Sequence, residues 1–322
     1  MTASDSLRPL GAGGPLVSRL CLGTSSWSHA RVGDGPVGAL EDVLGMPAGT
    51  PGRITFVDTS NEYGGGNSEV VIGAALDGRT GDLVLQTKLD RDPRTGDFGG
   101  ERMRRSLAES LERLRLDSVP LLYLHDPELI SYDEAFAVDG PVAALVAMKE
   151  SGVAERIGIS GGPAPMLSHY VATELFDAVI THNRFTLVDR SSAELVAEAA
   201  ARGMAVVNAA VYGGGALANW PQQATRYAYG PAAPETSEAV RRMGEACERA
   251  SVPLAAAAIQ FSSRHPNVTS TVIGATSAVH IRDAIAADLL DIPEALWDEL
   301  EALVPTSNVW QEPPGSTWPP AS

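Results

Sequence analysis

Eight short apolar runs recur along the chain, and segments with helical periodicity separate most of them. Most of the runs lack polar alternation, which is typical of parallel strands covered on both faces. The runs are Leu20–Gly23, Ile54–Asp58, Leu83–Lys88, Val119–His125, Arg156–Ser160, Ala178–Thr181, Ala205–Asn208 and Thr269–Gly274. Repeated alternation of strands and helices predicts a parallel α/β fold.

The segments between the runs carry the start and stop signals of helices. Met103, Leu107, Leu111 and Leu114 follow the spacing of a single amphipathic helix face. Further helices are predicted from Pro141 to before Gly152, from a cap at Asn67 to Gly78, from a cap at Ser192 to Gly203, and over Thr236–Ala250.

Two architectures fit this alternation, a (β/α)8 TIM barrel and a doubly wound sheet. We favour the barrel because polar residues stand at the ends of many strands, whereas a doubly wound enzyme concentrates them at one switch point. Gly11–Gly14 opens no helix, so the G-x-G-x-x-G fingerprint is missing after the first strand. A length of 322 residues suits one barrel with insertions, and no Pro/Gly-rich linker divides it. We expect a single domain over residues 1–322 with an irregular tail at about 305–322.

Composition and charge narrow the classes of partner. The net charge of −16 repels nucleic acid and anionic membranes, so we expect neither as a partner. The two cysteines, Cys21 and Cys247, do not form a disulfide framework, and neither has a second ligand nearby, so we expect no metal. Because no signal peptide and no long apolar run is visible, we expect a cytoplasmic protein.

Four chemically active side chains stand at or just after three predicted strands. Asp58, Lys88 and His125 end the second, third and fourth strands, and Tyr63 follows Asp58 by five residues. The carboxyl ends of barrel strands meet at one mouth, where barrel active sites lie. The sequence therefore predicts that an acid, an amine, an imidazole and a phenol converge there.

Three motifs around these residues resemble the signatures of the aldo-keto reductase family. They are Asp-Thr-Ser-Asn-Glu-Tyr-Gly from Asp58, Gln-Thr-Lys from Gln86, and Leu-His-Asp from Leu124, in the family's order and spacing. The resemblance extends from Leu20 to about Ala302. It implies a nicotinamide-dependent oxidoreductase with the catalytic tetrad Asp58, Tyr63, Lys88 and His125.

Each member of this tetrad has an expected role. A free tyrosine has a pKa near about 10, and we expect the Lys88 cation to lower the pKa of Tyr63. Asp58 is expected to pair with Lys88, and His125 to hydrogen-bond the substrate oxygen. Tyr63 would then donate a proton during reduction or remove one during oxidation.

The cofactor site departs from the family at three positions. Gly161 follows Ser160 where the family usually has Asn, His182 stands where Gln is common, and Ala209 replaces a stacking Tyr. Tyr212 is the candidate substitute. The assigned cofactor residues are Gly23, Thr24, Ser160, His182, Tyr212, Gly274, Ala275, Thr276, Ser277, His280 and Asp283.

The residues after the last strand favour NAD over NADP. Backbone amides at a helix N-terminus suit the adenosine phosphates. The stretch from Gly274 offers hydroxyls and His280, but no Lys or Arg in register for a 2′-phosphate. Arg282 is close in sequence but in a different register. NAD is therefore the preferred interpretation and NADP the alternative.

Stretches outside the tetrad resemble the bacterial aldose 1-dehydrogenase branch, which includes L-fucose, D-threo-aldose and pyridoxal dehydrogenases. These stretches are residues 182–190, 213–218 and 255–266. The sugar enzymes of this branch oxidise a lactol to a lactone. The substrate expected from the resemblance is thus an aldose such as L-fucose or D-arabinose.

Aromatic residues in two loops are the candidate pocket walls. Trp27 lies in the first loop, and the long loop from Tyr212 to about Pro234 carries Trp220, Tyr227 and Tyr229. Aromatic faces suit the C–H surfaces of sugars, so Trp27, Trp220 and Tyr227 are predicted to line the substrate pocket.

Two other functions stay open. One is an NADPH-dependent carbonyl or aldehyde reductase, and the other is a cofactor-bound sensor subunit without catalysis. The particular sugar or carbonyl, the physiological direction and the oligomeric state are left undetermined by the sequence.

Overall fold

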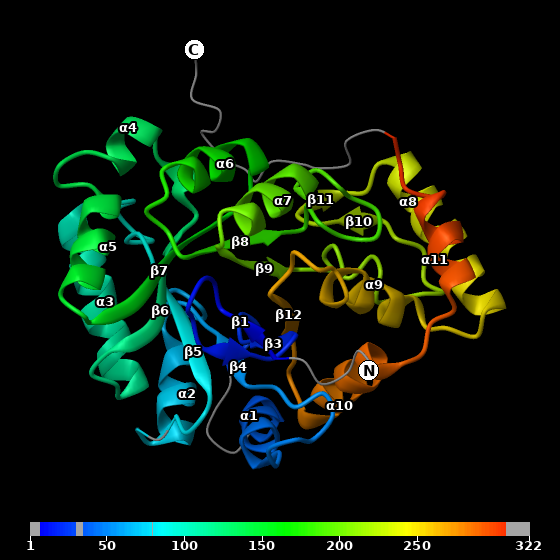
Figure 1. The fold of residues 1–322 in the computed structure, drawn as a ribbon, viewed down its shortest axis with the longest axis horizontal. Coiled ribbons are helices and arrows are strands. Elements are labelled where there is room, and N and C mark those ends of the chain that lie inside the picture. The colour runs from blue at the N-terminus through cyan, green and yellow to red at the C-terminus, as the bar shows by residue number, and fades with distance from the viewer. Residues whose placement is uncertain (1–6, 30–34, 79, 307–322) are drawn as a thin grey trace.

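Eight parallel strands close into a barrel, as the alternation of apolar runs predicts (Figure 1). The computed structural model describes residues 7–29, 35–78 and 80–306, so most of the predicted tail, with Trp310 and Trp318, lies outside the described residues. The barrel order is β12-β3-β4-β5-β6-β7-β8-β9. Its strands are β3 (Leu20–Gly23), β4 (Phe56–Asp58), β5 (Val84–Leu89), β6 (Val119–His125), β7 (Ala154–Gly161), β8 (Ala178–His182), β9 (Ala205–Ala209) and β12 (Ser270–Gly274).

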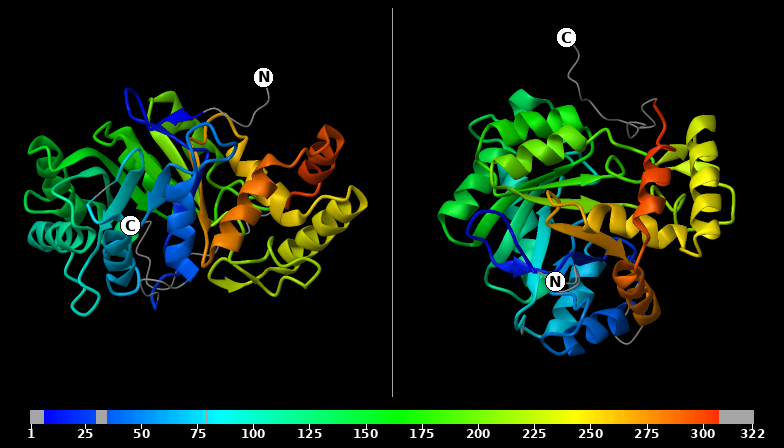
Figure 2. Two further views of the ribbon diagram at one scale, coloured as in Figure 1. Left: turned by 90° about the horizontal axis from the view of Figure 1, so that it is seen from below. Right: turned by 45° about the vertical axis from the view of Figure 1, so that its right-hand side comes forward.

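One helix or more follows each barrel strand and covers its outer face (Figure 2). The helices between and after the strands are α1 (Gly35–Gly45), α2 (Asn67–Leu76), α3 (Gly100–Leu114), α5 (Pro141–Glu150), α6 (Ala164–Ala172), α7 (Ala193–Ala201), α9 (Leu254–Ser263) and α10 (Ala278–Leu289). The additional elements are the 3-10 turn η1 (Pro127–Leu129), α4 (Tyr132–Ala135), α8 (Pro234–Arg249) and α11 (Glu294–Glu301). On one flank, α11 lies beside α8 (Figures 1 and 2).

The predicted helices are present, but two of their predicted caps act differently. Asn67 is the first residue of α2, and its side-chain amide donates to the Trp27 carbonyl at 2.9 Å. Gly66 occupies the cap position with a left-handed φ of 91°. Ser192 is the cap residue of α7, but its hydroxyl pairs with Thr181 Oγ1 at 2.9 Å. Both side chains therefore tie a helix start to a neighbouring loop or strand.

A short hairpin closes the floor of the barrel. Its strands are β1 (Arg8–Pro9) and β2 (Leu16–Val17), and the amide of Ala12 between them donates to the Gly203 carbonyl just before β9. Leu10 and Val17 pack on the apolar residues that fill the barrel interior. The interior residues include Cys21, Phe56, Val84, Leu121, Tyr123, Ala178, Ile180, Ala205 and Val207. Access to the interior from the N-terminal end is thus blocked.

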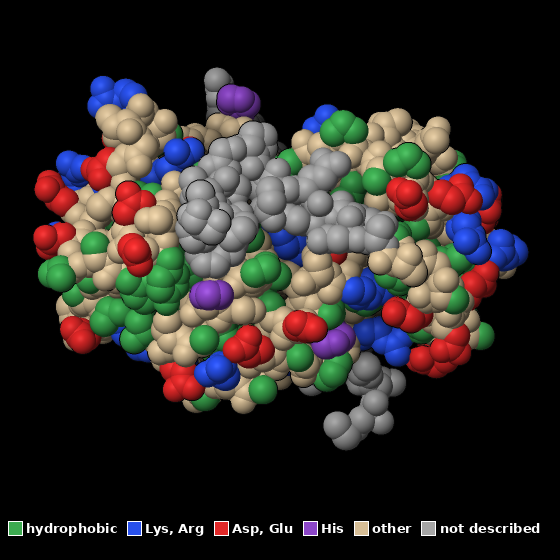
Figure 3. Space-filling model, turned by 90° about the horizontal axis from the view of Figure 1, so that it is seen from above, with side chains coloured by type: hydrophobic (Ala, Val, Ile, Leu, Met, Phe, Trp, Pro, Cys, Tyr) green, Lys and Arg blue, Asp and Glu red, His purple; other side chains and the backbone are tan. Residues whose placement is uncertain are grey.

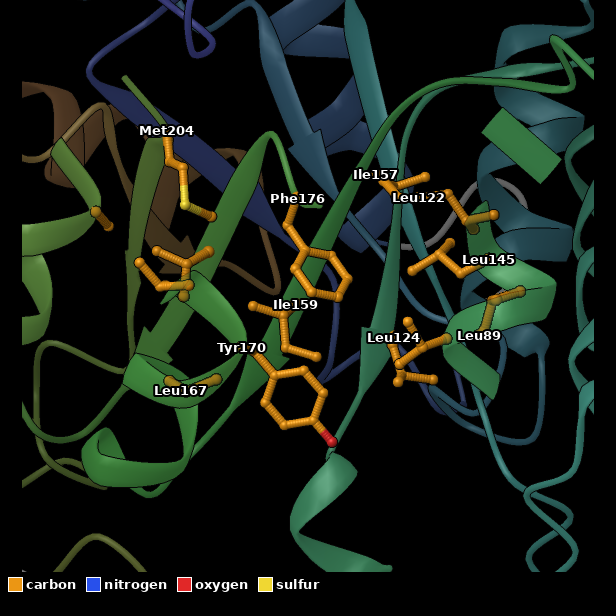
Figure 4. Packing of buried hydrophobic residues seen from close by; sticks show 14 of the residues in the cluster. Leu89, Leu122, Leu124, Leu145, Ile157, Ile159, Leu167, Tyr170, Phe176 and Met204 are labelled. Atoms are coloured by element: carbon orange, nitrogen blue, oxygen red, sulfur yellow. The ribbon is translucent and has the colours of Figure 1, made fainter. Parts of the chain in front are cut away.

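The largest cluster of buried side chains lies between β6, β7 and the helices outside them (Figure 4). Leu122, Leu124, Ile157 and Ile159 point outward from the strands toward Leu145 of α5 and Tyr170 of α6. Burial of each such side chain stabilises the fold by about 1.5–3 kcal/mol. This packing holds the strand ends that carry His125 and Ser160.

A glycine permits the close contact between α2 and α3. A Cβ on Gly73 would lie 2.0 Å from the carbonyl oxygen of Arg113. Because that neighbour is backbone rather than a flexible side chain, no larger residue fits there.

The outer surface mixes charges of both signs on the face shown in Figure 3. Over the whole sequence, 40 acidic residues outnumber 24 Lys and Arg, so the excess is acidic. Among the described residues, no helix combines the length and the apolar character needed to cross a bilayer.

Candidate active site

The register of β4, β5 and β6 brings three predicted site residues to one end of the barrel. Asp58 is the last residue of β4, Lys88 the penultimate residue of β5, and His125 the last residue of β6. Tyr63 reaches the same place from the loop between β4 and α2. Because parallel strands present their carboxyl ends together, the four side chains gather at the mouth, as their spacing predicts.

Lys88 connects the group through three hydrogen bonds. Its Nζ donates to Asp58 Oδ1 at 2.7 Å, to the Thr59 carbonyl at 2.7 Å and to the Tyr63 hydroxyl at 3.0 Å. Asp58 also accepts from the Gln86 side chain at 2.8 Å. Lys88 and Asp58 are buried, with 2% and 6% of their side chains exposed. An ion pair that is buried and fully hydrogen-bonded holds a fixed position.

The net effect on the phenol of Tyr63 is opposite to the predicted one. Burial raises the pKa of Tyr63, and the Lys88 cation opposes this without overcoming it, so the pKa lies above its ordinary value. Burial also lowers the pKa of Lys88, but Asp58 and Tyr63 raise it more, so Lys88 is charged. The predicted direction of the Lys88 effect holds, but the expected lowering of the pKa of Tyr63 is wrong because desolvation is the larger effect.

His125 has a carboxylate partner in Asp90, which the sequence prediction did not include. Its Nδ1 lies 2.6 Å from Asp90 Oδ1 and 3.2 Å from Ser60 Oγ, and its ring meets Tyr63 edge-on at 5.9 Å between centroids. Burial lowers the pKa of His125, but the carboxylates of Asp126 and Asp90 outweigh it and raise the pKa to about 9. His125 is therefore an imidazolium at neutral pH.

Further polar side chains stand beside His125 at the mouth. Asp126 Oδ1 lies 3.7 Å from His125 Nε2, and the carboxylates of Asp126 and Glu128 and an imidazole nitrogen of His182 lie within 4.8 Å of one another. Tyr229, whose ring is half exposed, places its hydroxyl 3.1 Å from His182 Nδ1. Burial lowers the pKa of His182 to about 4, so this imidazole is neutral. These residues form a wall of hydrogen-bonding groups next to His125, which we call the polar wall.

The side chains of Asp126, Glu128 and His182 lie close together within the polar wall. Burial and the neighbouring Asp126 carboxylate raise the pKa of Glu128 to about 7, although the guanidinium of Arg184 acts in the opposite direction. Arg184 is buried, and its guanidinium places a positive charge near the Glu128 carboxylate. The charge of the cluster is partly compensated by the protein's own side chains.

Three residues that directly follow barrel strands adopt the left-handed conformation that favours glycine, yet none is glycine. They are Asp126 after β6, Asn183 after β8 and Ala210 after β9, with φ of 47°, 58° and 54°. Asp and Asn tolerate this region better than other residues, whereas Ala does not. Backbone strain is thus located around the mouth.

A groove of about 740 Å³, a volume typical of small-molecule sites, lies beside the end of β12. It is lined by Tyr212, Gly274, His280 and Asp283 of the predicted cofactor residues, together with residues of α9 and α10. A side chain at Gly274 would meet open space, so this position leaves room for a ligand. Among the described residues that line the groove, none is Lys or Arg.

The start of α10 at this groove has its own internal bonds. Ser277 caps the helix by accepting from the His280 amide, and Thr276 Oγ1 lies 3.1 Å from His280 Nδ1. Arg282 instead pairs with Asp42 of α1 at 2.5 Å. Arg282 is therefore engaged with α1 and is not among the groove's lining residues.

The remaining predicted cofactor residues are less accessible. Thr24 is fully buried and its hydroxyl donates to the Asp58 carbonyl, so it supports the strand end of Asp58. Ala275 is buried and its carbonyl accepts from Trp27. Gly23 and Ser160 are buried at the ends of β3 and β7. His182 belongs to the polar wall and not to the lining of the groove.

The predicted pocket aromatics need correction. Trp27 is fully buried and donates through Nε1 to the Ala275 carbonyl at 2.7 Å, so it offers no open face. Tyr227 is 1% exposed and its hydroxyl donates to the Asn183 carbonyl at 2.7 Å. Trp220 packs over Gly244 of α8, in a surface hollow apart from the tetrad. Tyr229, from the same loop, is the aromatic residue that reaches the mouth.

Comparisons with known proteins identify the family of this chain. The model of the aldo/keto reductase family matches residues 20–305. The D-threo-aldose 1-dehydrogenase of a Pseudomonas species is 35% identical over 79% of this chain and 85% of its own length. The L-galactose dehydrogenase of Arabidopsis thaliana is 29% identical over 97% of each chain.

A solved aldo-keto reductase from Bacillus halodurans, in its holo form, superposes with a TM-score of 0.75 at 22% identity, covering 94% of this chain and 97% of its own. At that identity it supports the barrel fold. The family match spans most of the chain and includes the three strand ends described above. The chain therefore belongs to the aldo/keto reductase family and is an oxidoreductase that uses a nicotinamide nucleotide on a small-molecule substrate.

Proposed function

We propose that the protein is an NAD-dependent aldose 1-dehydrogenase that oxidises the lactol form of a sugar such as L-fucose or D-arabinose to its lactone. The observation that carries this proposal is the polar wall, which places carboxylate, imidazole and phenol groups beside His125. Relatives named as D-threo-aldose and L-galactose dehydrogenases support it.

Each residue of the tetrad has a task in this reaction. A nicotinamide nucleotide, when bound, would supply the acceptor for the hydride on C1 of the sugar. Tyr63, as phenolate, removes the proton from the hydroxyl on C1, and the remaining electron pair forms the C1 carbonyl of the lactone. Lys88, at 3.0 Å from the Tyr63 hydroxyl, stabilises that phenolate. The imidazolium of His125 donates a hydrogen bond to the same substrate oxygen and stabilises its developing negative charge.

The polar wall gives a reason for a sugar substrate. With the C1 oxygen on Tyr63 and His125, the neighbouring sugar hydroxyls come within reach of Asp126, whose carboxylate lies 3.7 Å from His125 Nε2. A carboxylate that accepts a hydroxyl bond contributes about 1.5–3 kcal/mol. A simple aldehyde offers no such hydroxyl and leaves the carboxylate without this bond. The site therefore favours polyhydroxylated substrates.

The groove beside β12 supports NAD as the preferred cofactor. A 2′-phosphate carries close to two negative charges and needs cationic donors. The described lining residues supply His280 and the acidic Asp283, and Arg282 is paired with Asp42. NADP would gain little from this groove and would be repelled by Asp283.

One steady-state experiment tests the proposal. The purified enzyme is assayed with L-fucose, D-arabinose and 4-nitrobenzaldehyde, each with NAD and NADP in the matching oxidation state. We expect the highest kcat/KM for a sugar with NAD. The Tyr63→Phe variant, which lacks the proton relay, is the negative control. Turnover of the aldehyde with NADPH and none of either sugar would overturn the proposal.

One observation favours the second candidate, a carbonyl reductase. Because burial raises the pKa of Tyr63, the residue is a phenol at neutral pH, which is the form that donates a proton during reduction. The aldehyde arm of the same assay measures this activity directly. A non-catalytic sensor has no need of the hydrogen-bonded Asp58–Lys88–Tyr63 group.

A further inference from the structure

Asp90 lies two residues after Lys88, directly beyond the end of β5, and is held firmly in place. It is 3% exposed. Its amide donates to Ser106 Oγ of α3 at 3.0 Å, and its carbonyl accepts from the Arg102 guanidinium at 3.0 Å. These bonds to α3 fix the backbone of Asp90 and so fix the direction of its carboxylate.

Both oxygens of the Asp90 carboxylate have partners at the mouth. Oδ1 lies 2.6 Å from His125 Nδ1. Oδ2 accepts from the Ser60 hydroxyl and, at 3.0 Å, from the Glu62 amide. Ser60 Oγ also lies 3.2 Å from His125 Nδ1. A carboxylate can only accept, so the 2.6 Å contact requires a proton on His125 Nδ1.

We propose that Asp90 is a positioning residue that fixes the ring of His125, with Nδ1–H on the Asp90 carboxylate and Nε2 presented to the substrate oxygen. Nε2 lies 3.7 Å from the part-exposed Asp126 and is thus the nitrogen on the open side of the mouth. This inference rests on the proposed function only for the identity of the substrate. The arrangement of Asp90 and His125 is independent of it.

The charged and titratable groups around His125 come from four strand ends. Glu62 and Tyr63 belong to the loop after β4, Lys88 and Asp90 to β5 and its end, Asp126 to the end of β6, and His182 to β8. Asp90 and Asp126 favour the imidazolium, whereas Lys88 opposes it. Asp90 differs from Asp126 because it also makes the short hydrogen bond to Nδ1. Loss of Asp90 therefore removes both a charge and an orienting contact.

The sign of the pH effect follows from this arrangement. The pKa of His125 is raised to about 9, so the imidazolium form is present below that pH and is lost above it. In Asp90→Asn the pKa falls, because the neighbouring negative charge is gone. An opposite charge in contact shifts a pKa by about 1–3 units. In the reduction direction, where Tyr63 acts as the phenol, the alkaline limb of the activity profile belongs to His125 and moves to lower pH by that amount.

The test combines a spectroscopic reading with kinetics. Two-dimensional ¹H–¹⁵N spectra of the imidazole rings are recorded across pH on the substrate-free protein, with His125 assigned through a His125→Asn variant among the six histidines. In the unmodified protein we expect His125 to titrate near pH 9 and to keep its proton on Nδ1. In Asp90→Asn we expect the titration to move down by about 1–3 pH units. We also expect kcat/KM to fall by about 10²-fold.

Asp92→Asn is the matched control, because it makes the same charge change two residues away on an exposed turn. The Asp92 carboxylate accepts from the Arg94 and Thr95 amides of its own turn. It should leave the His125 titration and kcat/KM unchanged. Circular dichroism confirms the folding of each variant.

Two results would overturn the inference. One is a neutral His125 that carries its proton on Nε2 in the unmodified protein, a result that does not depend on any change at Asp90. The other is a folded Asp90→Asn protein with an unchanged His125 titration. Failure of the proposed function shows itself separately, as absence of sugar oxidation by the unmodified enzyme while the ring spectra still report on Asp90.

Discussion

Replacing Lys88 with Met tests the electrostatic coupling at the centre of the site. Lys88 Nζ lies 3.0 Å from the Tyr63 oxygen; Lys88 is buried and Tyr63 is partly buried. At an effective dielectric constant of about 20, a cation and a phenolate at this distance attract by about 5 kcal/mol. Measured shifts for groups in contact are about 1–3 pKa units, and each unit is about 1.4 kcal/mol. Because about 1–3 pKa units correspond to less than the calculated value of about 5 kcal/mol, we take about 1–3 units as the expected shift in the pKa of Tyr63.

The direction of the change follows from the charge of Lys88. The cation lowers the pKa of Tyr63, so its removal raises a pKa that burial has already raised. Oxidation needs the phenolate, which forms only above that pKa. In Lys88→Met the phenolate should therefore form only at a pH that is higher by about 1–3 units. At any pH below the pKa of Tyr63, the phenolate fraction and with it kcat/KM for oxidation should fall by about 10- to 1000-fold.

The assay is the pH dependence of kcat/KM for sugar oxidation, measured for the unmodified enzyme and the variant. Lys88→Met leaves Asp58 buried without its cation, which costs about 3–5 kcal/mol of stability. The double variant Asp58→Asn/Lys88→Met removes both charges and controls for this loss. A folded variant whose profile superimposes on that of the unmodified enzyme would refute the coupling.

Three further changes have defined outcomes. Tyr63→Phe should lower turnover by about 10²–10⁴-fold and leave cofactor affinity nearly unchanged, as measured by kinetics and by fluorescence titration. Thr276→Arg, at the start of α10, should shift the ratio of kcat/KM values toward NADP, because it adds a cation beside the groove. If the unmodified protein binds NADP about tenfold more tightly than it binds NAD, this reasoning is contradicted. Gly73→Ala should lower the melting temperature, since its Cβ would lie 2.0 Å from the Arg113 carbonyl, whereas Gly45→Ala, with open space around it, should not. Equal melting temperatures would show that α2 and α3 separate easily.

The barrel was predictable because its strands are buried on both faces. Each of the eight apolar runs corresponds to a barrel strand, with ends that differ by at most two residues. The hairpins β1–β2 and β10 (Arg226–Tyr227) with β11 (Gly230–Pro231) were not predicted. Their strands have two residues each, which is too short for any periodicity to show. Their positions depend on tertiary contacts instead.

The candidate site was only partly predictable. The sequence pattern marks the ends of strands, but it does not show how distant segments pack together. The convergence of Asp58, Lys88 and His125 follows from strand ends, which the pattern marks. Burial of Trp27 and Tyr227 depends on the packing of distant segments, so both were wrongly placed in the pocket. The pKa of Tyr63 was misjudged for the same reason, since desolvation is a property of the folded site. Asp90 could have been found from its position two residues after Lys88, because alternate residues of an extended chain point to the same side.

The left-handed residues after β6, β8 and β9 bear on how such an enzyme can change its substrate over evolutionary time. Asp126, Asn183 and Ala210 hold backbone conformations that glycine adopts without strain. The left-handed conformation costs a residue other than glycine about 1–2 kcal/mol. Mutation to glycine at these positions removes a side chain and also relieves that strain. A single mutation to glycine at the mouth can therefore change the substrate specificity without destabilising the fold. Such a mutation changes only the rim and leaves the residues of the barrel interior as they are.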